Sequence, residues 1–161
     1  MWIFTGDQAQ QFLRLLAAIA VGAVFGLDRH IRHKPAGVRT HSLVCLGAAV
    51  VTLGAANAFP HTNTVQALQG VVSGVGFLGA GLILHGGRSS DVHGLTTAAS
   101  LWFVASVGAV LGLGGWFVSL VASLLGLTVL LFGGAIENRF DTETRRSGKD
   151  HPSETSKHDD P

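Results

Sequence analysis

The residues best suited to chemistry form a polar cluster between residues 28 and 41. Asp28 and Arg29 stand together at the end of an apolar run, and Arg39 and His41 follow a short segment with a proline and a glycine. A carboxylate at the edge of a membrane run is costly unless a cation pairs with it. The cluster therefore predicts either a structural ion pair in a basic loop or a fixed polar lid at the mouth of a helix bundle.

A second polar group opens a later apolar run. Thr96 and Thr97 stand at its start, and Ser100 follows one turn later. Hydroxyl groups at such positions bond to a neighbouring helix or back to their own backbone. Hydrogen bonding between helices is the favoured interpretation, and contact with a substrate is the alternative.

A third feature is a glycine-dense stretch between residues 70 and 81. Residues 74–79 read G-x-G-x-x-G, but no strand precedes them, so a dinucleotide site is not indicated. Close packing of helices is the favoured interpretation. The alternative is a broken helix whose freed carbonyls line an ion path. The glycines concerned are Gly70, Gly74, Gly76, Gly79 and Gly81.

Metal-site and catalytic signals are weak. Asp28 and Asp91 are the carboxylates expected on the same side of the membrane as several histidines. They are weak candidates for metal ligands. Their spacing matches no tight ligand motif, and Mg²⁺ seldom sits in an all-protein cage. No nucleophile–base pair, carboxylate pair or phosphate loop is recognisable. We therefore expect no enzyme and no resident cofactor.

The elements that must position these residues are apolar runs of membrane-spanning length. Charged residues make up only 13% of the 161-residue chain, about half of what soluble domains carry. Runs approach the roughly 20 residues that a spanning helix needs. They cover residues 11–27, 41–59, 66–84, 94–112 and 115–136. The chain is thus predicted to be an all-α, multi-pass membrane protein with about five transmembrane helices.

Lysine and arginine indicate how these helices are oriented. Basic residues follow the first, third and fifth runs, whereas the loops after the second and fourth contain none. Because basic loops stay in the cytoplasm, we expect the N-terminus outside and the C-terminus inside. Arg14, near the outer end of the first run, either extends to the interface or faces the bundle.

The last stretch of the chain differs in composition. Residues 137–161 are polar and mixed in charge, which predicts a disordered cytoplasmic tail after a membrane domain at 1–136. The net charge is +1, so nucleic acid is not an expected partner. Membrane lipids, a second copy of the chain or another membrane protein are the partners expected of helix faces rich in small residues.

Together these motifs resemble the MgtC/SapB family. The resemblance runs from about residue 15 to 115 and rests on three segments in order. They are Gly26-Leu27-Asp28-Arg29 with Lys34–His41, Gly74–Gly81, and Gly94–Trp102. The family's usual Glu-Arg pair is Asp28-Arg29 here, which keeps the charge. The polar tail in place of a folded C-terminal domain is similar to the short SapB/YhiD-type members.

The resemblance implies a bacterial inner-membrane protein concerned with magnesium or other cations. Mg²⁺ would be a transport substrate or a signal. A transport component would place Asp28 at the cytoplasmic mouth and the carbonyls of 74–81 along the path. The alternative is a regulatory binding module that acts on another membrane protein, for example the F-type ATP synthase, or in acid tolerance.

Overall fold

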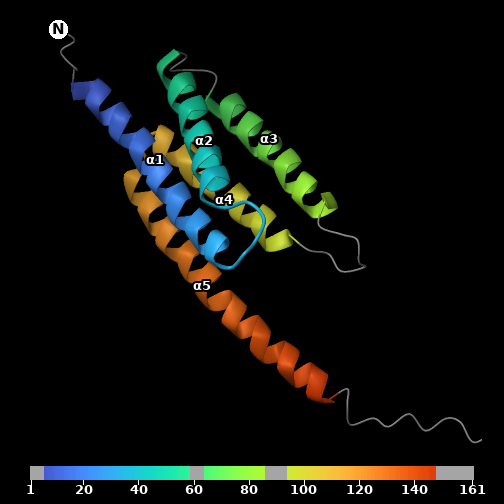
Figure 1. Ribbon diagram of the computed structural model, residues 1–161. Coiled ribbons are helices and arrows are strands. Elements are labelled where there is room, and N and C mark those ends of the chain that lie inside the picture. The colour runs from blue at the N-terminus through green and yellow to red at the C-terminus, as the bar shows by residue number, and fades with distance from the viewer. Residues whose placement is uncertain (1–5, 59–63, 86–93, 148–161) are drawn as a thin grey trace, which may run out of the picture. The chain divides into compact units, whose positions relative to one another are not determined.

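The computed structural model describes residues 6–58, 64–85 and 94–147. In these ranges the regular secondary structure is all helix, and each helix is long and apolar enough to cross a membrane (Figure 1). The prediction of an all-α protein with five spanning helices is confirmed. The helices are α1 (Gly6–Ile31), α2 (Val38–Ala58), α3 (Thr64–His85), α4 (Leu95–Gly112) and α5 (Trp116–Ser147).

The chain divides into two compact units, residues 1–127 and 128–161. The first unit holds α1 to α4 and the start of α5. The boundary expected at residue 136 falls inside α5, which continues as one helix to Ser147. The remainder of the polar tail, 148–161, and the loop with Asp91 lie outside the described residues.

Helix α4 is the centre of the first unit. It contacts α1, α2 and α3. Of the residues in its membrane-spanning stretch 61% are buried, compared with 11% of those in α3. This follows from its composition, because α4 is apolar or small on every side and carries no charged residue. A helix of this kind is stable only when other helices surround it. The core beside it contains Val75, Leu101 and Ala105.

Two pairs of glycines let neighbouring backbones approach closely. A Cβ atom at Gly22 would lie 2.5 Å from the Ser42 Cα, and one at Gly26 would lie 2.5 Å from the Val38 Cα. On α4, Gly108 and Gly112 lie even closer to the backbone of α2. Each pair has G-x-x-x-G spacing, which places both glycines on one helix face. These contacts hold α2 between α1 and α4.

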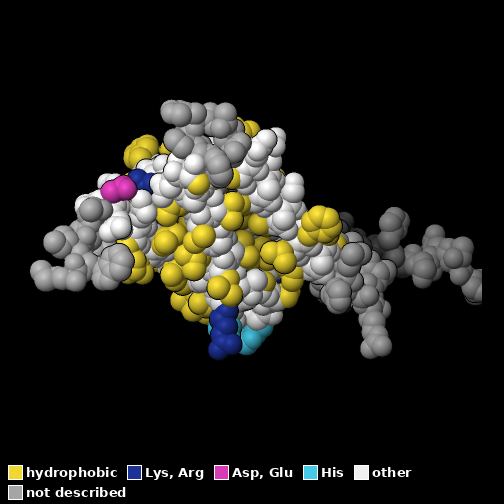
Figure 2. Space-filling view, turned by 90° about the horizontal axis from the view of Figure 1, so that it is seen from above, with side chains coloured by type: hydrophobic (Ala, Val, Ile, Leu, Met, Phe, Trp, Pro, Cys, Tyr) yellow, Lys and Arg dark blue, Asp and Glu magenta, His cyan; other side chains and the backbone are white. Residues whose placement is uncertain are grey.

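Much of the outer surface is apolar. Phe77 is 83% exposed and Phe117 is 78% exposed, and many leucines and valines accompany them. In Figure 2, apolar side chains cover much of the described surface in view, and charged ones are few. An exposed surface of this kind suits lipid rather than water. The architecture is therefore that of a multi-pass membrane protein.

Candidate functional site

A buried arginine joins α1 to α4. Arg29 is only 4% exposed, and its Nη2 donates a hydrogen bond of 2.8 Å to Oγ1 of Thr97. Thr97 is itself 1% exposed. The Nε of Arg29 is also buried and has no hydrogen-bond partner among the described residues. A guanidinium held in this way ties the end of α1 to the start of α4, and its position is fixed by the surrounding helices.

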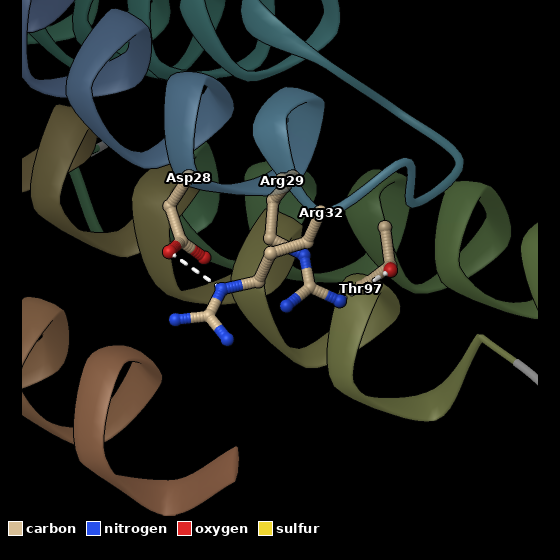
Figure 3. A network of polar contacts seen from close by, with 4 residues as sticks. All are labelled: Asp28, Arg29, Arg32 and Thr97. Atoms are coloured by element: carbon tan, nitrogen blue, oxygen red, sulfur yellow. Dashed lines mark hydrogen bonds and ion pairs between the residues drawn. The ribbon is translucent and has the colours of Figure 1, made fainter. Parts of the chain in front are cut away.

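Asp28 pairs with a different arginine. Its Oδ1 accepts a hydrogen bond of 2.8 Å from Nε of Arg32, one turn further along α1. Its other oxygen, Oδ2, is buried and accepts no bond from the described part of the chain. Figure 3 shows the Asp28–Arg32 pair on one side of α1, while Arg29 reaches toward Thr97. Among the described residues, the ion pair of Asp28 is therefore with Arg32 and not with the adjacent Arg29.

His41 forms the third part of the site and joins α2 to α4. The side chain is fully buried; Nδ1 lies 3.1 Å from the carbonyl oxygen of Gly37, and Nε2 lies 3.0 Å from Oγ of Ser100. The Ser100 hydroxyl also lies 2.8 Å from the carbonyl oxygen of Thr97. A connected set of polar groups therefore runs from the α1–α2 loop through α2 and α4 to Arg29. We call Arg29, His41, Thr97 and Ser100 the buried polar network.

The structure separates the predicted site residues into two groups. Arg29, His41 and Thr97 come together in the buried polar network, and Asp28 lies beside it on α1. Arg39 and Thr96 are exposed and take no part in it. The reason is helical geometry, since successive residues point about 100° apart around the axis. Asp91, the second metal candidate, lies outside the described residues.

The glycines of α3 do not line the interior of the described bundle. Gly70, Gly74, Gly76 and Gly81 have no described atom within 4 Å of where a Cβ would stand. A Cβ at Gly79 would lie 3.4 Å from the Ala98 Cβ, an ordinary contact with α4. Helix α3 is also continuous from Thr64 to His85. Its backbone carbonyls are consequently engaged in the helix, unlike those of a broken helix.

Sequence reasoning missed several residues that position the site. It did not single out Gly22, Gly26, Gly108 and Gly112 as packing residues, although their G-x-x-x-G spacing was a readable signal. It also left the role of Arg14 open. Nη1 of Arg14 donates to the Gly112 carbonyl at 3.3 Å, so it caps the end of α4. Its distance from Asp28 along α1 places it away from the polar network.

Chemically, the site is an arrangement of fixed charges and hydroxyls. No group of three or more His, Cys, Asp or Glu side chains that could hold a metal occurs among the described residues. What the network offers is one buried cation, one buried imidazole and two hydroxyls that connect three helices. Such a set can hold helices in register or respond to charge.

Comparison with known proteins identifies the kind of protein that carries this site. The model of the MgtC family matches residues 15–139, most of the chain. The chain belongs to the MgtC family. Protein SrpB of Synechococcus elongatus is 44% identical over 123 residues, which cover 69% of this chain and 68% of SrpB. The resemblance expected from the motifs is thereby confirmed.

The relatives named MgtC are matched over only part of their length. Protein MgtC of Salmonella typhimurium is 47% identical over 102 residues, or 63% of this chain and 43% of that protein. Protein MgtC of Brucella abortus is 40% identical over 100 residues, which cover 62% of this chain and 41% of that protein. The chain thus spans less than half of each MgtC relative. No solved structure matches it.

Proposed function

We propose that this chain is a bacterial inner-membrane protein of magnesium or cation homeostasis and has no enzymatic activity. Its membership in the MgtC family and its five spanning helices support a homeostatic role in a membrane. The observation that carries the proposal is the buried polar network with Asp28 beside it at one end of the bundle. Buried ionisable groups in spanning helices are costly, and in membrane proteins they usually mark a function.

The first mechanism is transport of Mg²⁺, with Asp28 at the entrance. The observation that favours it is the buried Oδ2 of Asp28, which has no partner among the described residues and would accept a bond from a hydrated cation's water once the side chains around it move. Arg32, on the opposite side of the carboxylate, is 39% exposed and can move aside. In this mechanism Mg²⁺ is cargo and the chain holds no resident cofactor.

The second mechanism is regulation through a bound membrane protein. The observation that favours it is the outer face of α3, where Gly70, Gly74 and Gly76 have open space and Phe77 is exposed. Small residues beside a large apolar one suit contact with another spanning helix. The exposed Arg32, Lys34 and Arg39 then lie where anionic lipid headgroups bind.

The experiment is flux of Mg²⁺ and H⁺ into liposomes that hold the purified protein. Asp28→Asn keeps the shape of the side chain and removes its charge. Asp7→Asn is the matched control, because Asp7 lies on the same helix at the other end and is exposed. Transport predicts that Asp28→Asn reduces flux at least about tenfold while Asp7→Asn does not. Absence of flux from the folded protein would eliminate transport and leave regulation.

A further inference from the structure

His41 is a titratable side chain with no exposed surface, and each ring nitrogen lies at hydrogen-bond distance from an oxygen. Nδ1 is 3.1 Å from the Gly37 carbonyl oxygen and Nε2 is 3.0 Å from the Ser100 hydroxyl oxygen. The same hydroxyl is 2.8 Å from the Thr97 carbonyl oxygen. These are three short oxygen contacts in a row across α2 and α4.

The contacts need more protons than a neutral histidine supplies. A carbonyl oxygen only accepts, so one proton must lie on Nδ1 and another must lie between Ser100 and Thr97. A third proton is then required between Nε2 and the Ser100 oxygen. A neutral imidazole and a hydroxyl together supply two protons, whereas an imidazolium and a hydroxyl supply three. Only the protonated ring satisfies every contact.

Both neutral forms leave one contact without a proton. With the proton on Nδ1, the Ser100 hydroxyl must choose between Nε2 and the Thr97 carbonyl. With the proton on Nε2, the lone pair of Nδ1 faces the Gly37 carbonyl oxygen. An unmade hydrogen bond in a buried site is costly. Loss of the proton from His41 therefore changes the contact between α2 and α4.

The charged groups around His41 come mainly from α1. Arg29 is close enough to act on His41 electrostatically, and its positive charge opposes a second one. Asp28 acts on Arg29 in turn and offsets part of that charge. His30 lies beside Gly37, where a Cβ would be 3.5 Å from the His30 Nδ1. On its own helix, His41 has the exposed Arg39 and the buried Cys45 as titratable neighbours.

The remaining helices bring no titratable group to His41. Helix α4 has no acidic or basic residue, and α3 has none before His85 at its end. Helix α5 has none before Glu137. The hydroxyl of Ser100 and the carbonyl of Gly37 thus directly stabilise a proton on this ring, against the cost of burying its charge and the opposing charge of Arg29.

We propose that His41 is a proton-binding site whose occupancy is coupled through Ser100 to the Thr97 segment of α4. The ligand is a proton from solvent water, taken up by Nε2 when Ser100 donates to Thr97 and returned to water when Ser100 turns to Nε2. Because Thr97 also accepts from Arg29, the proton on α2 is linked to the position of the buried guanidinium on α1. This inference stands on the hydrogen-bond geometry and does not depend on transport.

The test is a pH titration of the full chain in nanodiscs by ¹⁵N and ¹³C NMR. The ring nitrogens of His41 are assigned by correlation to its backbone, which separates them from those of His30. We expect both nitrogens to take imidazolium shifts together as the pH falls, at a single midpoint. The carbonyl ¹³C of Thr97 should titrate with the same midpoint.

Two serine variants make the test specific. In Ser100→Ala the acceptor for Nε2–H is gone, so the midpoint should fall by about one unit, a tenfold loss of proton affinity. Ser106→Ala is the matched control, because the Ser106 hydroxyl donates to the Trp102 carbonyl on its own helix at 3.0 Å. Its midpoint should match the unmodified chain. A ring that stays neutral from pH 5 to 8, or an unchanged midpoint in Ser100→Ala, overturns the proposal.

Discussion

Thr96 and Thr97 are neighbours in the chain but have opposite surroundings. Thr97 is buried and accepts the hydrogen bond from Arg29, whereas Thr96 is exposed. Both side chains have the same size and chemistry, so their difference lies entirely in which side of α4 they occupy. This makes them a matched pair for measuring what the link between α1 and α4 contributes.

We predict that Thr97→Val destabilises the protein and Thr96→Val does not. Valine keeps the shape of threonine but removes the hydroxyl oxygen, so the buried Nη2 of Arg29 loses the acceptor it has on α4. The cost should be about 1–3 kcal/mol, the usual penalty for an unpaired buried polar group. The measurement is unfolding in detergent followed by circular dichroism. Equal stability of the two variants would show that the Arg29–Thr97 bond contributes nothing.

Close contact between helix backbones in this bundle depends on glycines on particular helix faces. Gly108 and Gly112 of α4 lie against the backbone of α2, and Gly22 and Gly26 of α1 lie against the other side of α2. Gly70 and Gly74 of α3 have the same spacing but no described neighbour within 4 Å. The spacing of the glycines alone therefore does not predict whether another helix packs against them.

We predict that Gly108→Ala is strongly destabilising and Gly74→Ala is not. A Cβ at Gly108 would overlap the Cys45 carbonyl, which is backbone and cannot turn aside. Overpacking of this kind costs about 1–3 kcal/mol, whereas alanine is favoured over glycine in an open helix by about 0.5–1 kcal/mol. Thermal unfolding of the two variants in the same detergent measures the difference. A Gly74→Ala variant as unstable as Gly108→Ala would contradict this prediction, because it would mean that other atoms pack closely against Gly74.

At the scale of the whole molecule, α3 packs against the described part of the bundle through one of its sides. Val75 and Gly79 are buried, and the partly buried Leu68, Val71 and Leu82 pack against the same core. The opposite side carries Phe77 with Gly70, Gly74 and Gly76. This outer side is the surface that the regulatory mechanism needs.

We predict that cysteine at Ser73 cross-links to a partner helix in native membranes if α3 is a docking surface. Ser73 is exposed on the open side of α3, and the Cys45 thiol is buried and competes little. Cysteine at Ala99 serves as the control, since it is exposed on α4 away from the glycines. Gly74→Leu should remove the cross-link from Ser73→Cys without changing the unfolding temperature. A cross-link at both positions or at neither would speak against a specific surface on α3.

The sequence by itself predicted the five spanning helices and the family. Apolar runs of bilayer length are local properties, because in lipid a segment must satisfy its own backbone hydrogen bonds within a helix. The sequence also contained the motifs that indicated the family, namely Asp28-Arg29 and the glycine and threonine segments. The orientation of the termini stays a prediction from the basic residues.

The tertiary structure alone decided which of these residues meet. In the folded chain, Asp28 pairs with Arg32 instead of Arg29, and Thr97 is buried whereas Thr96 is exposed. Glycines of α1 and α4 make the closest contacts between helices in the described residues, whereas those of α3 do not. The tertiary structure also joined His41 to Ser100, 59 residues apart. The physical reason is that hydropathy and length determine that a segment becomes a helix, whereas its rotation and its neighbours depend on packing between segments distant in sequence.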